Sequence, residues 1–482
     1  MVFSTMLFLW VFLPFVIIGN TLIGRLGISD EAKVRTRNIF LLIASLIFYA
    51  WGGPRYLLLM LSVILINYFC ARLITGYEAY SKIILAAGLA ADILILVYFK
   101  YLNLIVHTME KLSGHELSGF RDIVLPIGIS FYIFQSMSYT IDVYRKEAVC
   151  RKNILDFALY VSLFCQLIAG PIVQYRDIKD QLVKREVSRM RFSDGINRFV
   201  YGLAKKVLLA NVFGETVDAI WDMGAGNIGT MLSVGAAVLY SLQIYYDFSG
   251  YSDMAIGLAK MLGFELKENF DHPYMALTVS SFWRRWHISL SSWFKNYVYI
   301  PLGGNRRGLA RTCVNIFMVF LLTGIWHGAN YTFFFWGIYY ALFLIAERIV
   351  KTVWRKSGSD MKAGIAAKTA GHIYTLAVVI VGWVFFRADS IGDALRFLRA
   401  FFRPETSSET VLEFLTLKLC VAATAGILLC GPLQKMFSGF CEKKSDKGWY
   451  MLGRIAAVAA LSALSILSLA GDTYNPFIYY QF

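Results

Sequence analysis

The chain has 482 residues, of which 57% are hydrophobic and 16% charged, and its formal net charge is +15. Apolar stretches of about 17 residues or more, long enough to cross a bilayer, recur along the chain and exclude an ordinary soluble domain. The basic residues lie in short loops between these stretches, as the positive-inside rule requires, so the charge indicates topology and contact with membrane lipids rather than nucleic-acid binding. The seven cysteines are scattered without disulfide or metal spacing, and we expect reduced thiols and no metal site.

The first part of the chain reads as a series of membrane spans. Residues 6–24 lack a basic leader and a cleavage site, which predicts a retained span rather than a signal peptide. The basic loop at residues 25–37 is assigned to the inside, so the N-terminus is predicted to lie outside. Further spans are expected at residues 39–51, 57–73, 83–98 and 124–144.

Residues 154–173 form an apolar run with basic loops on both sides, which disfavours a plain crossing. The Gly170-Pro171 pair breaks the helix, and irregular backbone is tolerated at membrane depth where protein or a water-filled cavity surrounds it. We therefore predict a re-entrant or half-membrane segment here. Residues 199–221, which contain Lys205 and Lys206, are predicted to form an interfacial amphipathic helix.

The second part of the chain returns to apolar runs and ends outside. Counting three crossings from the basic loop at residues 351–368 places the C-terminus on the outer side. Without an internal repeat, an inverted-repeat transporter gains no support. We expect one helical membrane domain over residues 1–482, with roughly ten or more spans and some half-helices. The runs lie at residues 231–246, 254–264, 314–326, 333–350, 373–386, 411–429 and 451–470.

Residues 245–330 are the predicted catalytic stretch, because polar and aromatic groups interrupt the apolar pattern there. Tyr246, Asp247 and Ser249 lie between apolar flanks, and unsatisfied polar groups in hydrocarbon are costly, so a wet or substrate-filled cavity is expected. Asp247 and Asp253 either orient a histidine or an arginine or form ion pairs that hold helices together.

Two histidines, His287 and His327, each follow a tryptophan. An ionisable group such as His327, at the end of an apolar run, indicates a functional site, and its imidazole can take a proton from a hydroxyl. Gly328 and Ala329 would leave room for a substrate beside the ring. The alternatives are a structural histidine within a bundle for His327 and an interfacial residue at headgroup level for His287.

Several neighbours are candidate substrate contacts. The guanidinium groups of Arg284, Arg285 and Arg306 could meet cofactor phosphates or lipid headgroups. His287, Asn330 or tryptophan N–H groups would stabilise a developing oxyanion. The predicted binding residues are Trp326, Asn330, Trp286, Arg284, Arg285, Asp247, Tyr246 and Ser249.

The motifs together resemble the membrane-bound O-acyltransferase family, in the branch of bacterial alginate O-acetyltransferase membrane subunits. Short motifs at residues 2–5, 49–52, 125–131, 170–172 and 246–253 resemble the same branch, so the likeness covers almost the whole chain. The residues that carry it most strongly are 282–290, 297–306 with Pro301 and Gly303-Gly304-Asn305, and 324–329.

This resemblance implies a ring of helices around a central funnel or tunnel, with His327 as the catalytic histidine and His287 as the second polar position. It also implies an acetyl-CoA or acyl-carrier thioester donor on the cytoplasmic side of a bacterial inner membrane. The implied acceptor is an extracytoplasmic polysaccharide, reached with a separate SGNH esterase-like protein. Residues 477–482 resemble the C-terminal motif of D-alanylation partner proteins, which makes Tyr479 a candidate acyl relay in an outward tail at residues 471–482. Its alternative is an aromatic interfacial anchor.

Two other function classes stay open on the sequence alone. A polysaccharide or lipid-linked sugar transporter would use the aromatic belt for stacking, and a scaffold subunit would recruit an exopolysaccharide synthase. Thioester consumption separates the acyltransferase from both, since neither alternative needs His327 to cleave a thioester.

Overall fold

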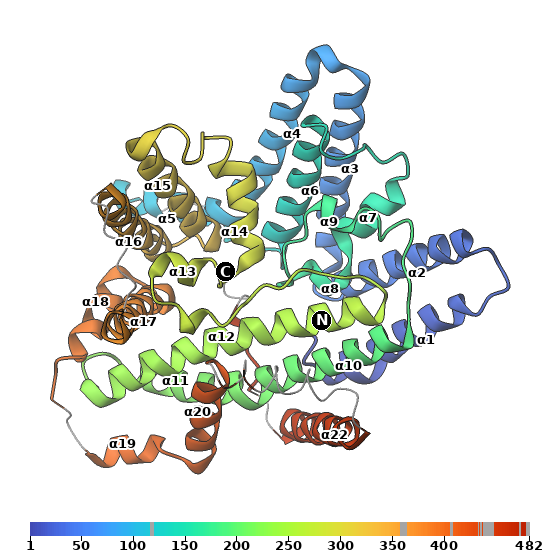
Figure 1. The fold of residues 1–482 in the computed structure, drawn as a ribbon. Coiled ribbons are helices and arrows are strands. Elements are labelled where there is room, and N and C mark those ends of the chain that lie inside the picture. Colours follow the sequence, from blue (N-terminus) through green and yellow to red (C-terminus); the bar gives the residue numbers. More distant parts are fainter. Residues whose placement is uncertain are drawn as a thin grey trace. The chain divides into compact units, whose positions relative to one another are not determined.

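The computed structural model describes residues 1–115, 120–356, 364–404, 408–431, 433, 436, 448–471 and 474–478. Over these ranges every regular element is a helix (Figure 1). Six helices are long and apolar enough to cross a membrane, and two shorter apolar helices, Phe8–Gly24 and Leu417–Leu429, accompany them. The prediction of a polytopic all-α membrane protein is therefore confirmed.

The chain divides into two compact units, each described by itself. The first comprises Met1–Phe199 and Tyr251–Lys267. Within it α3 packs against α4 and α6, and α2 packs against α1 and α7. Its elements are η1 (Phe8–Phe12), α1 (Leu13–Gly24), α2 (Asp30–Ala50), α3 (Pro54–Gly76), η2 (Glu78–Tyr80), α4 (Ser81–Leu96), η3 (Val97–Tyr101), α5 (Leu102–Ser113), α6 (Ile129–Tyr144), α7 (Ile154–Ser162), α8 (Phe164–Leu167) and α9 (Tyr175–Ile178).

The second unit comprises Val200–Gly250 and Glu268–Phe482, and α10 (Arg189–Ala204) and α12 (Thr230–Met261) contribute to both units. In the second unit α15 packs against α16, and α16 packs against α17. Its remaining elements are η4 (Lys205–Ala210), α11 (Asn211–Asp222), η5 (Pro273–Met275), α13 (Val279–Trp283), α14 (Ile288–Phe294), η6 (Lys295–Tyr299), α15 (Gly308–His327), α16 (Tyr331–Lys356), α17 (Ile365–Arg387), α18 (Ile391–Ala400), α19 (Ser408–Phe414), α20 (Leu417–Leu429) and α22 (Gly448–Gly471).

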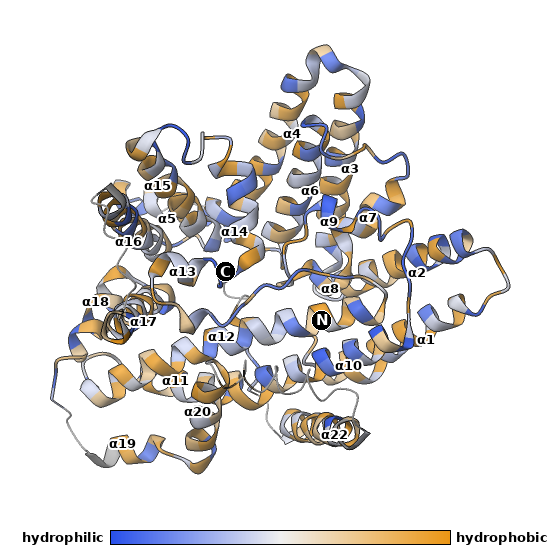
Figure 2. Ribbon diagram, in the orientation of Figure 1, coloured by the Kyte–Doolittle hydropathy of each residue, from blue (hydrophilic) through white to orange (hydrophobic). Residues whose placement is uncertain are grey.

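Three predicted apolar runs differ from the observed helices, because the sequence does not show which polar and apolar residues are buried. Helix α6 is buried on all sides from Ile129 to Val143, so its apolar residues face protein. The two apolar runs at residues 231–246 and 254–264 are parts of the single helix α12, whose intervening polar residues are buried. By contrast, α22 matches its predicted run, and Figure 2 shows it mostly in the hydrophobic colour.

Residues 154–173 do not form a continuous helix. Helix α7 ends at Ser162, α8 ends at Leu167, and residues 169–174 have no helical structure, while every residue from 157 to 175 is buried. The predicted helix break is present; the side of the membrane stays a prediction. The run at residues 411–429 is likewise divided, because the Thr416 side chain accepts a hydrogen bond from Leu419 N and starts α20 anew.

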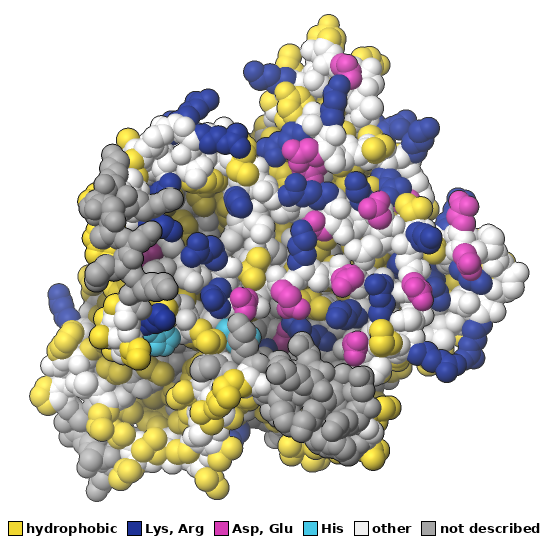
Figure 3. Space-filling view, in the orientation of Figure 1, with side chains coloured by type: hydrophobic (Ala, Val, Ile, Leu, Met, Phe, Trp, Pro, Cys, Tyr) yellow, Lys and Arg dark blue, Asp and Glu magenta, His cyan; other side chains and the backbone are white. Residues whose placement is uncertain are grey.

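The predicted interfacial helix at residues 199–221 is wrong in one respect. α10, η4 and α11 follow one another without a gap, but Lys206 is buried and bonded to Asp247 instead of lying at headgroup level. The sequence showed two adjacent lysines and not the carboxylate 41 positions later. On the face drawn in Figure 3, Lys and Arg side chains over the first unit are interspersed with Asp and Glu and do not form one basic patch.

Candidate active site

His327 is the last residue of α15, three residues after Gly324, where the backbones of α15 and α16 approach closely. A Cβ at Gly324 would lie 2.3 Å from the Phe333 carbonyl oxygen, and one at Gly337 would lie 2.5 Å from that of Phe320. The two glycines therefore permit an approach of the backbones that no side chain would allow. This contact fixes the end of α15 against α16.

Aromatic side chains enclose the His327 imidazole, which is 4% exposed. Its ring centroid lies 5.0 Å from those of Trp326 and Trp336 and 5.1 Å from that of Phe386, each in an edge-on arrangement. These rings come from α15, α16 and α17. Large rigid rings around an imidazole exclude water, which strengthens the electrostatic interactions of a reacting group.

Gly328 does not leave the open space beside His327 that the sequence suggested. A Cβ at this position would lie 2.3 Å from the Phe333 ring. The absence of a side chain at residue 328 makes room for Phe333, and α15 ends here because Gly328 is extended, with φ −172°.

His287 is positioned by polar contacts and by its backbone. It precedes α14 with φ 45° and ψ 55°, a left-handed conformation that costs about 1 kcal/mol in a residue with a side chain. Its Nδ1 lies 3.2 Å from Asn269 Oδ1, and that oxygen also accepts hydrogen bonds from Ser289 N (3.1 Å) and Ser289 Oγ (2.9 Å). Asn269 thus joins both residues to the start of α14.

This network assigns the tautomer of His287. Asn269 Oδ1 is an acceptor because it receives the Ser289 N–H, so the His287 Nδ1 must carry a proton and donate it. Nε2 is then the unprotonated nitrogen of a neutral ring. His287 is 1% exposed, and burial lowers its pKa to about 3, which keeps the ring neutral near pH 7.

Trp326 links the two histidines. Its ring centroid lies 5.0 Å from that of His327 and 6.1 Å from that of His287, while the Phe248 ring lies 4.6 Å from His287 on α12. Residues 40 positions apart in sequence therefore share one aromatic cluster. We call His287, Trp326, His327 and Trp336 the histidine cluster.

A cavity of about 1220 Å³ reaches His287. Its lining comes from residues 278–354, includes Trp283, and carries four basic side chains, Arg284, Lys295, Arg348 and Lys351. Glu347 is the acidic residue of that lining, and its carboxylate accepts hydrogen bonds from Val279 N (2.6 Å) and Ser280 N (2.8 Å) at the start of α13. The basic groups thus leave an excess of positive charge, which suits an anionic ligand.

Trp283, one of the lining residues, has a buried hydrogen-bond donor. Its Nε1 is buried and has no hydrogen-bond partner among the described residues, although the side chain lines the cavity. A buried N–H without a partner costs free energy, so a ligand acceptor would stabilise it. Trp283 lies four residues before His287, within the motif at residues 282–290, and was not among the predicted binding residues.

Among the other candidate residues, Trp286, Asn330 and Arg285 contact groups of the protein. Trp286 stacks on Phe282 at 5.5 Å and lies outside the cavity lining. The Asn330 amide donates to Asp389 O (2.8 Å) and accepts from Thr332 N (3.1 Å), which caps α16. Arg285 Nη1 lies 3.6 Å from Asp271, whereas Arg284 lines the cavity and Arg306 is exposed.

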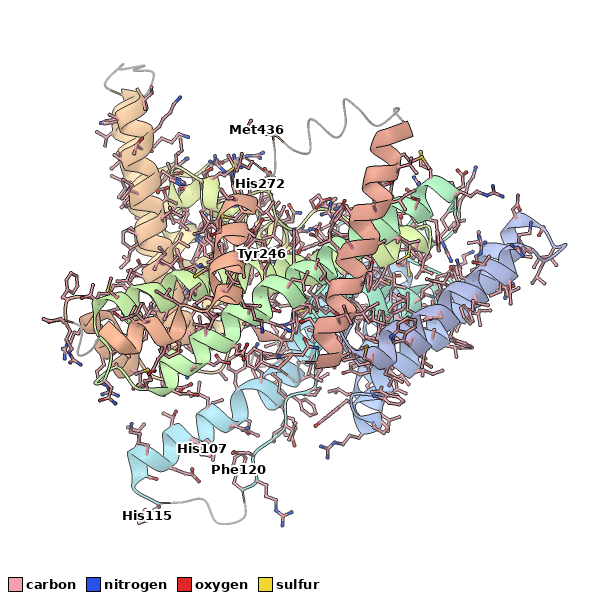
Figure 4. All side chains as sticks on the ribbon, turned by 90° about the horizontal axis from the view of Figure 1, so that it is seen from below. His107, His115, Phe120, Tyr246, His272 and Met436 are labelled. Atoms are coloured by element: carbon pink, nitrogen blue, oxygen red, sulfur yellow. The ribbon has the colours of Figure 1, made fainter. Side chains whose placement is uncertain are left out.

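The predicted binding residues in the middle of α12 lie outside the histidine cluster. Tyr246 donates to Gly426 O on α20 at 2.7 Å (Figure 4), and Ser249 is buried. Asp247 pairs with Lys206 at 2.7 Å and, in the first unit, Asp253 pairs with Arg198 at 2.6 Å, so Asp247 contacts a lysine and Asp253 an arginine. Tyr479 lies outside the described residues.

Several contributors were missed in the sequence: Asn269, Ser289, Trp336, Lys295, Arg348 and Lys351. Asn269 belongs to the polar stretch but is a single amide 18 residues before its partner. The α16 residues lie on an apolar run, and the side of it that faces the cavity is known only once the packing against α13 is known. In the part of the chain that the structure describes, no group of three or more His, Cys, Asp or Glu residues could hold a metal ion.

Comparison with known proteins bears on this geometry. A family model described as membrane-bound O-acyltransferase matches residues 44–386. The probable alginate O-acetylase AlgI of Pseudomonas putida is 37% identical over the full length of both chains. The peptidoglycan O-acetyltransferase of Helicobacter pylori is 33% identical, covering 83% of this chain and 79% of that protein. The teichoic acid D-alanyltransferase of Bacillus subtilis is 25% identical, covering 78% of this chain and 96% of that protein.

Proposed function

Because the chain belongs to the membrane-bound O-acyltransferase family, as its motifs predicted, we propose that it moves an acetyl group from a thioester donor toward an extracytoplasmic polysaccharide. Two similar proteins are named as O-acetylating enzymes, one for alginate and one for peptidoglycan. The observation that carries the proposal is the histidine cluster, one member of which, His287, lines a large basic cavity.

In the proposed reaction His327 acts as general base. It takes the proton of an acceptor hydroxyl while the hydroxyl oxygen attacks the thioester carbonyl. The new C–O bond forms, the C–S bond breaks, and the proton passes to the departing thiolate. Enclosure of the imidazole by Trp326, Trp336 and Phe386 supports this role because water cannot compete as acceptor.

The tautomer of His287 changes its proposed role. With the proton on Nδ1 and bonded to Asn269, Nε2 accepts a hydrogen bond and does not donate one to an oxyanion. We therefore assign His287 to positioning a substrate hydroxyl or amide. We assign the oxyanion donor to the Trp283 indole N–H, since Trp283 lines the same cavity and this buried N–H has no hydrogen-bond partner among the described residues.

The cavity supports a phosphate-bearing donor. Arg284, Lys295, Arg348 and Lys351 surround a space large enough for the pantetheine arm of acetyl-CoA or of an acyl carrier protein, and both donors carry phosphate. The basic lining supports our proposal that the donor enters from the cytoplasmic side, because the positive-inside rule favours basic residues there. The two donors share this chemistry, and the assay below separates them.

The remaining parts of the proposal concern location and partners. The protein would lie in a bacterial inner membrane with both termini outside, and an extracytoplasmic SGNH esterase-like protein would complete transfer to the polysaccharide. Tyr479 would act as an acyl relay between them. The transporter and scaffold alternatives have no specific observation in their favour, because neither requires a histidine cluster beside a basic cavity.

The test is acyl transfer by the full chain in lipid nanodiscs, with labelled acetyl-CoA in one arm and acetylated acyl carrier protein in the other. We compare wild type, His327→Ala and His372→Ala; His372 is another histidine of the same unit, and its ring nitrogen lies 3.2 Å from Ala276 O. Thioester loss in wild type and His372→Ala, but not in His327→Ala, supports the proposal. Full activity of His327→Ala removes the general base, and no consumption of either donor by wild type argues against an acyltransferase using these thioesters.

A further inference from the structure

The C-terminal segment, residues 474–478, is held through its main chain. Tyr474 O accepts a hydrogen bond from Asn211 Nδ2 (3.1 Å), and Pro476 O accepts one from Lys206 Nζ. Ile478 N donates to Asp247 Oδ2 at 2.9 Å. Three main-chain groups of a five-residue segment are thus bonded to side chains of η4, α11 and α12. Such contacts recognise an extended peptide largely independently of its side chains.

One side chain of the segment has its own slot. The Tyr474 hydroxyl donates to the Asp218 carboxylate, which Arg387 of α17 also contacts at 2.6 Å. A Cβ at Gly214 would lie 2.8 Å from the Tyr474 hydroxyl oxygen, so a glycine is needed there. Phe477 and Ile478 are also buried, at 4% and 6% exposure. The segment is therefore seated in the second unit.

The charges that hold the segment are buried. The side chains of Lys206 and Asp247 are 4% and 2% exposed and lie 2.7 Å apart. A buried ion pair repays its loss of hydration only when its remaining donors and acceptors are satisfied. The Pro476 carbonyl and the Ile478 N–H supply those bonds, so the ion pair and the segment stabilise each other. Lys206 also lies in a π-helical turn, a feature that recurs at functional sites.

We propose that Lys206, Asp247 and Asn211 form a peptide-docking site whose ligand is the chain's own C-terminal segment. They act as positioning residues for the transfer by holding residues 474–478 in place. The docking is independent of the chemistry, and only this positioning role rests on the proposed function. Asp247, expected from the sequence to contact substrate, is thereby assigned to the segment.

The experiment measures docking without substrate. The full chain in nanodiscs is exposed to a carboxypeptidase, and trimming is followed by mass spectrometry for wild type, Lys206→Met, Asp247→Asn and Tyr474→Phe. Arg198→Met is the matched control, because it breaks another basic-acidic pair that α12 makes, the one between Arg198 of α10 and Asp253 in the first unit. Tyr474→Phe leaves the buried ion pair intact and serves where a charge variant fails to fold.

Wild type and Arg198→Met should resist trimming beyond residue 478. Lys206→Met and Asp247→Asn should lose residues 474–478 about tenfold faster or more, and Tyr474→Phe should lie between them, since one hydrogen bond changes an equilibrium by roughly a factor of ten. Equal trimming of all variants would overturn the docking site. The same preparations are then assayed for acyl transfer. An unchanged kcat in a variant whose segment is released would overturn the positioning role. An inactive wild type whose segment is protected would contradict the proposed function but not the docking site.

Discussion

The two histidines of the histidine cluster are held in different ways. His327 owes its place to helix packing, through the Gly324–Gly337 contact and three aromatic rings. His287 owes its place to a hydrogen-bond network and to a left-handed backbone at the start of a short helix. Packing fixes where a ring lies, whereas a hydrogen bond also fixes which nitrogen carries the proton. This difference fits the proposed roles, in which His327 accepts a proton and His287 positions the substrate.

The largest effect on kcat is expected from replacing His327. His327→Ala should lower kcat for transfer by about 10²–10⁴-fold, the usual contribution of a general base. The measurement is single-turnover transfer with each variant checked for monodispersity in nanodiscs. His287→Ala should lose less, because it removes a positioning contact; equal losses would mean that the two rings share one role.

Changing the packing alone should also disable His327. Gly324→Ala places a methyl group 2.3 Å from the Phe333 carbonyl oxygen, and relieving this overlap should cost about 1–3 kcal/mol. Thermal unfolding and kcat should both fall. Gly235→Ala on α12 is the control, since nothing lies within 4 Å of its Cβ, and it should be neutral or stabilising. Equal melting temperatures for Gly324→Ala and wild type would contradict the close helix contact.

Removing the hydrogen bond alone should affect His287 more mildly. Asn269→Ala takes away the acceptor of His287 Nδ1 and of two Ser289 donors, so kcat/KM should fall about tenfold, as expected for roughly 1.4 kcal/mol. Ser289→Ala removes one of the three bonds and should lose less. If Ser289→Ala were the more damaging change, the tautomer assigned to His287 would be wrong.

Acidic pH should destabilise the folded chain through His287. Its pKa is about 3 in the folded chain and near 6.5 when unfolded, so between these values only the unfolded state binds the proton. The free energy of unfolding therefore keeps its full value above about pH 6.5, and protonation of His287 in the unfolded state lowers it as the pH falls toward 3. Thermal unfolding at pH 7 and pH 5 should show a smaller drop for His287→Gln than for wild type; identical drops would contradict burial of a neutral ring.

The smallest expected effect concerns the cavity that reaches His287. Arg348→Met or Lys351→Met should raise KM for the donor a fewfold, because a partly exposed charge contributes about 1 kcal/mol or less, and should leave kcat unchanged. The increase should shrink at high salt. Arg306→Met, at an exposed arginine outside the cavity lining, is the control. A KM unaffected by all four cavity cations would separate the donor from this cavity.

The sequence predicted the helical membrane fold and the family, because apolar runs and short motifs are local features. His287 and His327 were selected for the same reason, since each stands out from its neighbours. The partners were not predictable: Asn269, Trp336 and the α16 cations join the site only when separate helices pack together.

Asp247 shows the same limit from the other direction. Its polar context suggested a substrate contact, and the structure pairs it with Lys206 and Ile478, 41 and 231 positions away. Lys206 in turn was expected at the interface. A buried ion pair cannot be predicted from one sequence, because each of its residues resembles an ordinary surface charge until its partner is known.

The docked C-terminal segment also imposes an order on biosynthesis. Ile478 is made 231 residues after Asp247, and at about 5–20 residues per second the ribosome needs roughly 10–50 s to produce it. During that interval the charged pair in η4 and α12 lacks two of its hydrogen bonds. A chain that stops before Ile478 keeps this deficit, so the synthesis of residues 474–478 is itself a folding step.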